Sequence, residues 1–97
     1  MTDVVVNCTP VDDGWRCRVT VRDDRGTSEH VVQVGQADAA DLAVAIEASH
    51  VERLVEETFD FLLERESKES ILATFELPVV ERYFPGYRDE MRRRLAP

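Results

Sequence analysis

The chain contains few of the residues on which most enzymes depend. Its 97 residues include two histidines, two cysteines and one lysine, and its four glycines are isolated from one another. Because a phosphate-binding loop needs clustered glycines, a nucleotide site of that type is excluded. Beyond His30 and His50 there is no evident general base. We therefore expect that the protein is not an enzyme.

The spacing of cysteine and histidine also disfavours a metal site. Cys17 is expected opposite Val34 on a neighbouring strand, which puts His30 roughly 13 Å from that pair. Zinc needs all its ligands within about 2.3 Å of one point. A bond between Cys8 and Cys17 is geometrically possible, but a cytoplasmic setting would keep the pair reduced. We expect two buried thiols and no metal or other cofactor.

Long apolar runs are absent as well. No segment reaches the roughly 18 residues of a membrane span, and the first residues lack the basic start of a secretory signal. The net charge of -8 disfavours general binding to nucleic acid or to an anionic membrane. Eleven arginines against one lysine are typical of a GC-rich genome. These features predict a cytoplasmic bacterial protein that does not bind membranes.

The strongest local pattern is a strand. Residues 14–22 alternate strictly, with Trp15, Cys17, Val19 and Val21 on one face. Turn signals on either side predict flanking strands, with Cys8 opposite Cys17 in the first hairpin. Closing the second hairpin at residues 25–26 would place Arg22 beside Glu29. Residues 1–35 are therefore predicted to form a three-stranded antiparallel β-meander.

The opposite face of the central strand carries a row of arginines, Arg16, Arg18 and Arg22. In isolation such a row is typical of a phosphate-binding face. Asp3 and Glu29 are predicted across the strands from Arg22, and opposite charges there stabilise a sheet. We therefore interpret the row as a solvated face partly neutralised by its neighbours.

The rest of the chain, residues 38–97, is predicted to be helical. A short helix is expected from Asp38, with Leu42, Ala45 and Ile46 on one stripe. The stripe changes phase near Ser49, which favours a break and a new helix from about residue 50. From residue 51 the apolar residues follow the spacing of one buried helix face. That main helix also carries an acidic ridge, formed by Glu52, Glu56, Glu57, Asp60, Glu64 and Glu66.

Short helices are expected after the main one. Ser67 can cap a helix ending near residue 76, Pro78 suits the start of the next, and Pro85 can open the last. We predict one α+β domain spanning residues 1–97. In it, a three-stranded antiparallel β-meander packs against a long amphipathic helix and short C-terminal helices.

Aromatic residues indicate the favoured function. Phe61 lies off the main apolar stripe, and Tyr83, Phe84 and Tyr87 surround Pro85 in a highly charged segment. Tyrosine and other aromatics are favoured anchors of protein interfaces, provided that they are exposed. We expect a non-enzymatic adaptor or regulatory domain that binds a protein partner or forms a homodimer.

Nucleic-acid binding is the alternative. Residues 67–84 have the lengths of a helix-turn-helix-like unit, and the last helix carries Arg88, Arg92, Arg93 and Arg94. The second helix of this unit, which would have to contact the bases, offers only Arg82 beside Glu81. Base recognition normally uses several arginine, lysine or amide side chains. The C-terminal arginines could equally lie on the protein's own acidic ridge, and the sequence leaves this open.

Overall fold

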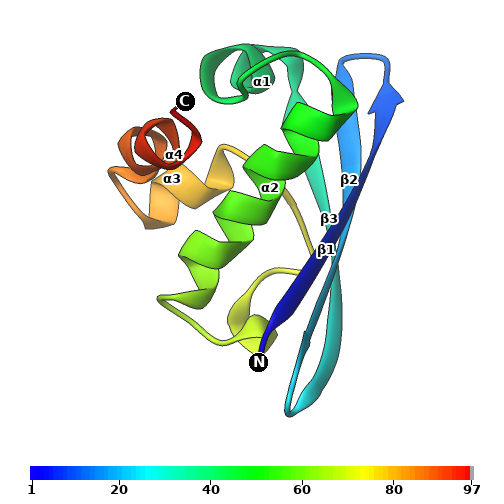
Figure 1. Cartoon of the computed structure of the whole chain (residues 1–97), viewed down its shortest axis with the longest axis vertical. Helices are drawn as coiled ribbons and strands as arrows, with labels where there is room; N and C mark the ends of the chain where they lie inside the picture. The colour runs from blue at the N-terminus through cyan, green and yellow to red at the C-terminus, as the bar shows by residue number, and fades with distance from the viewer. Residues whose placement is uncertain (97) are drawn as a thin grey trace.

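The computed structural model describes residues 1–96 and has the α+β architecture that the sequence predicts (Figure 1). Strands β1 (Asp3–Val11), β2 (Gly14–Asp23), β3 (Gly26–Gly35) and β4 (Thr74–Glu76) form one sheet in the order β1-β2-β3-β4. The helices are α1 (Gln36–Leu42), α2 (Ala48–Leu63), α3 (Val79–Tyr83) and α4 (Tyr87–Leu95), with a 3-10 turn, η1, at Lys68–Ser70. All of them lie on one side of the sheet, so no helix of residues 1–96 lies on its other face.

The predicted first hairpin is confirmed residue by residue. Cys8 lies opposite Cys17, Val6 opposite Val19 and Asp3 opposite Arg22. A two-residue turn closes the hairpin before Gly14, where a β carbon would lie 2.0 Å from the carbonyl oxygen of Val34. Only glycine can therefore occupy this position.

The second hairpin closes one residue earlier than predicted. Asp23 pairs with Gly26, so Cys17 lies opposite Val32 rather than Val34, and Glu29 lies opposite Thr20 rather than Arg22. The cause is local, because the carboxylate of Asp23 accepts a hydrogen bond of 2.8 Å from the Arg25 amide and sets the turn there. The partner of each residue shifts by two positions, so the same valines still face the core.

A second correction concerns residues 67–76, which do not form a helix. After η1 the chain runs into β4, which pairs with β3 in parallel through Val31 and Thr74, Val32 and Phe75, and Gln33 and Glu76. β3 offers free amides and carbonyls along its outer edge, and β4 satisfies them while Phe75 packs near Phe59. The helix-turn-helix-like unit predicted for residues 67–84 is therefore not formed.

The helix after β3 also differs from its prediction. α1 begins at Gln36 with Gly35 rather than Asp38 at its N-cap, and it ends at Leu42. Ile46 consequently lies outside any helix and is 52% exposed. The predicted break before the main helix is confirmed, although α2 begins at Ala48 without a side-chain cap.

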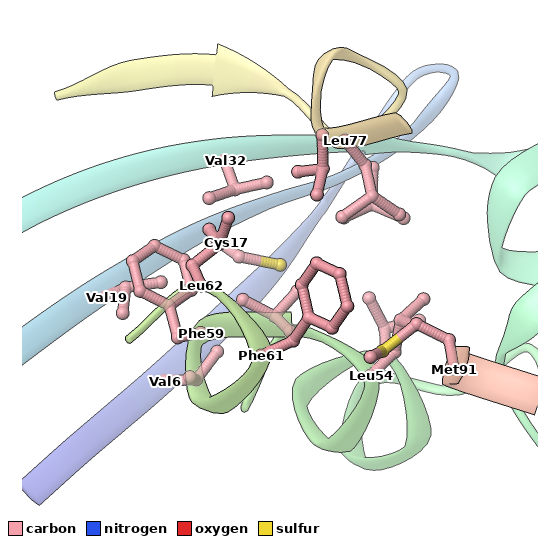
Figure 2. Packing of buried hydrophobic residues seen from close by; sticks show 14 of the residues in the cluster. Val6, Cys17, Val19, Val32, Leu54, Phe59, Phe61, Leu62, Leu77 and Met91 are labelled. Atoms are coloured by element: carbon pink, nitrogen blue, oxygen red, sulfur yellow. The ribbon is translucent and has the colours of Figure 1, made fainter. Parts of the chain in front are cut away.

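The core forms where the predicted stripe of α2 meets the inner face of the sheet. Figure 2 shows Leu54, Phe59 and Leu62 of α2 between valines of the strands and Met91 of α4. Inside this core the Thr58 hydroxyl donates to the Leu54 carbonyl. Its oxygen also lies 2.6 Å from the Tyr87 hydroxyl, so the last helix is joined to α2 by a buried polar contact.

The two cysteines are bonded, which corrects the expectation of two thiols. Cys8 and Cys17 form a disulfide across β1 and β2, with their Cα atoms 4.0 Å apart. The two residues are directly opposed at a position where neighbouring strands come close, which brings both sulfur atoms to one face. Cys17 is fully buried, whereas Cys8 is half-buried at the edge of the sheet.

Candidate functional site

An apolar groove of about 370 Å³ lies between the end of α2, the segment after η1, β4 and α3. We call it the Tyr83 groove. Its floor is formed by Leu62, Ile71, Phe75 and Val80, which are buried. Its rim includes Leu72, which is 50% exposed, and Tyr83, which is 69% exposed.

One rim of the Tyr83 groove is held by a buried histidine. The Nδ1 atom of His30 donates to the carbonyl oxygen of Leu72 at 2.8 Å, since a carbonyl can only accept. The Ser28 hydroxyl lies 2.8 Å from the other ring nitrogen, and the ring packs against Phe59. Both nitrogens are satisfied, so His30 fixes the Leu72 segment to β3 and is a structural residue.

The only lysine anchors the same segment from its other end. Lys68 is almost fully buried, and its ammonium lies 2.8 Å from the carboxylate of Asp23 and also contacts that of Glu69. The hydrogen bond that Lys68 donates to Asp23 lowers the pKa of the Asp23 carboxyl and raises the pKa of the Lys68 ammonium. This ion pair fastens η1 to the turn between β2 and β3. Sequence reasoning missed it, because Asp23 and Lys68 are far apart in the chain.

The four aromatic candidates divide into two pairs. Phe61 and Tyr87 are buried and pack edge to face, with ring centres 5.5 Å apart. Burial raises the pKa of the Tyr87 hydroxyl well above its usual range. Phe84 is half-buried and Tyr83 exposed, and both line the groove. The off-stripe Phe61 thus contacts the chain's own C-terminal segment, and only Tyr83 and Phe84 face a possible partner.

The C-terminal arginines contact acidic side chains of the same chain, but within residues 1–96 only Arg94 reaches the predicted acidic ridge, through Glu64. Arg88 reaches Asp38 and Asp41 of α1, each at 2.7 Å, and Arg92 reaches Asp41 at 2.8 Å. These contacts lower the pKa of Asp41.

The other two arginines of α4 are paired in the same way. Arg94 lies 2.9 Å from both Glu64 and Glu90, and Arg93 contacts Glu90. The basic end of α4 is thus neutralised by α1, α2 and α4 itself.

The arginine row of β2 shows the opposite arrangement. Within residues 1–96, Arg16, Arg18 and Arg22 make no ion pair. Arg22 does lie across from Asp3, but Glu29 is shifted away from it by the register of the second hairpin. Of the two predicted neighbours only Asp3 is in place, and the row lies on the face of β2 opposite its buried residues.

Other kinds of site find no support in the described part of the chain. No three residues among histidine, cysteine, aspartate and glutamate lie together in a way that could hold a metal ion in residues 1–96. Over the same residues, no helix is both long enough and apolar enough to cross a membrane. The chain matches no family model, no curated protein and no solved structure in the comparisons. Function must therefore be argued from the geometry of the chain itself.

Proposed function

We propose that this chain is a non-enzymatic adaptor or regulatory domain that binds a segment of a partner protein in the Tyr83 groove. The observation that carries the proposal is the exposure of Leu72 and Tyr83 above a floor of buried apolar side chains. Solvent-exposed aromatic and aliphatic groups around a concave apolar surface are typical of sites that take one or two anchoring side chains. The ion pair of Lys68 with Asp23 of β2 and the hydrogen bond of His30 of β3 with Leu72 hold its rim in place.

Charge defines the chemistry of the partner. Glu66 lies in the groove at the end of α2 and makes no ion pair within residues 1–96. The chain as a whole carries a net charge of -8. A segment with an apolar anchor next to lysine or arginine fits both features, because the cation can pair with Glu66 while the anchor fills the groove.

Nucleic-acid binding loses the two features that favoured it. Residues 67–76 form a turn and a strand rather than the first helix of a binding unit. Arg88, Arg92, Arg93 and Arg94 are paired with acidic side chains of the same chain. A phosphate backbone would have to displace these carboxylates, so we do not favour this function.

Location is a separate part of the proposal. The arginine-rich composition supports a bacterial source, and we propose a cytoplasmic site of action. Cytoplasmic reductants would open the Cys8–Cys17 bond. Trapping of free thiols in intact cells tests this directly: free Cys8 and Cys17 support the cytoplasm, and a fully bonded pair contradicts it.

The interaction is tested by selecting random peptides on the wild-type chain and measuring their affinity for two groove variants, Leu72→Ala and Tyr83→Ala, and one control, Ile46→Ala. Leu72→Ala removes an apolar side chain from the groove, and Ile46→Ala removes one of similar exposure elsewhere. We expect selected peptides to combine an aromatic or aliphatic anchor with a basic residue. Their affinity should fall at least tenfold for Leu72→Ala and Tyr83→Ala and stay unchanged for Ile46→Ala. Peptides that bind all of these variants equally well would refute the proposal.

A further inference from the structure

The outer edge of β1 has backbone groups with no partner. The Cys8 amide points away from β2, because it donates to the carboxylate of Glu52 on α2 at 2.9 Å. Successive amides of a strand alternate in direction, so those of Val6 and Val4 point the same way. Within residues 1–96 neither amide has a hydrogen bond outside the sheet, and Pro10 has no amide hydrogen to offer. The open part of this edge is therefore Val4–Val6.

Within residues 1–96, no strand pairs with the outer edge of β1. In Figure 1 the strand runs in front of β2 and β3, and α2 lies near its upper end but diverges from it toward the N-terminus. The opposite edge of the sheet is different, since β4 covers part of β3. Proteins usually protect such an edge with charged residues or proline, yet residues 4–9 contain neither.

We propose that β1 pairs with β1 of a second copy in antiparallel orientation, with the two Val5 residues facing each other on the twofold axis. In this register the outward amides and carbonyls of Val4 and Val6 of one copy meet those of Val6 and Val4 of the other. Shifting the centre to Val6 would require the Cys8 amide, which Glu52 already occupies. The hydrogen bond from the Cys8 amide to Glu52 therefore excludes the register centred on Val6 and favours the one centred on Val5.

Charge and exposure favour a second copy as the occupant. Val5 is 57% exposed on the helix-free face of the sheet, and the pairing buries it against its equivalent. Two chains of net charge -8 repel each other, but the paired segment Val4–Val6 itself carries no charge. Asp3 of one copy comes to lie beside Asn7 of the other, next to Arg18 on β2, which lacks an ion pair in the described chain. The pairing supplies Arg18 with an acidic neighbour.

Sedimentation over a range of concentrations tests self-pairing. The wild-type mass should rise from 11.1 kDa toward twice that value, and added salt should favour the dimer because it screens the repulsion between the copies. Val5→Lys places two like charges on the axis and should weaken association at least tenfold. Val11→Lys is the matched control, since Val11 is an exposed valine on the same face of β1 but beyond the paired part.

The register has its own test. Val5→Cys puts a thiol on the opposite face of β1 from Cys8, and mild oxidation should link two copies through it, whereas Val11→Cys should not crosslink. A wild-type chain that stays monomeric, or a dimer that tolerates Val5→Lys, overturns the proposal. The proposal would also be overturned if the chain stayed monomeric and an unrelated extended peptide protected the Val4 and Val6 amides from hydrogen exchange. Tyr83→Ala should leave the dimer intact, which separates this proposal from that for the groove.

Discussion

His30 and Leu72 are joined by a hydrogen bond of 2.8 Å between a ring nitrogen and a main-chain carbonyl, across 42 positions of sequence. This contact connects the centre of β3 to the rim of the Tyr83 groove. Because His30 is buried, its loss would leave the carbonyl of Leu72 without its partner. The groove therefore depends on a residue that does not line it.

His30→Phe keeps a ring in the core but removes both hydrogen bonds. We expect the free energy of unfolding to fall by about 1–3 kcal/mol, because the Leu72 carbonyl and the Ser28 hydroxyl lose their partner. Urea unfolding measures this change. His50→Phe, at a partly exposed histidine, should change stability by less than about 0.5 kcal/mol. Equal effects of the two substitutions would show that the buried hydrogen bonds are unimportant.

The ion pair of Lys68 with Asp23 should make stability depend on pH. The pKa of Asp23 is lowered from 3.8, so its contribution is complete above that pH and is lost as pH falls through the folded-state pKa. The pKa of Lys68 is raised from 10.5, so its contribution is complete below that pH and is lost as pH rises further. Both groups therefore stabilise the fold across the neutral range.

Lys68→Met tests this dependence. The difference in unfolding free energy between wild type and Lys68→Met should be constant from about pH 5 to 9 and shrink at more acidic or more alkaline pH. Arg25→Met, in the same turn, is the control, and its difference from wild type should not follow this profile. A Lys68→Met difference independent of pH would mean that only the packing of the lysine stem matters.

Arg88 should contribute more to the stability of the fold than the other arginines of α4. It joins α4 to two aspartates of α1 and also contacts Glu81 of α3, and its side chain is partly buried. Arg88→Gln should lower the unfolding free energy by about 1–2 kcal/mol, since several charged hydrogen bonds are lost together. Arg93→Gln should have almost no effect, because Arg93 is exposed and, within residues 1–96, its ion pair is with Glu90 of the same helix. Thermal melts of the two variants provide the comparison.

Reduction of the Cys8–Cys17 bond should destabilise the fold. The two residues are nine positions apart, and closing a loop of that size stabilises by on the order of 2–3 kcal/mol. Unfolding measured with and without a thiol reductant gives this value. Under reducing conditions Cys17→Ser should lower the free energy of unfolding more than Cys8→Ser does, because Cys17 is fully buried and Cys8 is not. Identical unfolding in both redox conditions would show that the bond does not form in solution.

Local patterns in the sequence were sufficient to predict much of the fold. The alternation of residues 14–22 and the turn before Gly14 predicted the first hairpin with its register. The apolar spacing from Val51 predicted the buried face of α2. These elements were predictable because a strand of period two or a helix of period 3.6 is encoded by residues that are neighbours in the chain.

Tertiary contacts decided the rest. Residues 74–76 became a strand because β3 left an edge unpaired, and no local signal distinguishes that from a helix. The exposure of Tyr83, the burial of Tyr87 and the pairing of the C-terminal arginines depend on how α4 packs against α1 and α2. Composition and periodicity thus determined the α+β class and the core face of each main element. The Tyr83 groove arose only when segments distant in sequence came together, and the β1 edge stayed open because no distant segment paired with it.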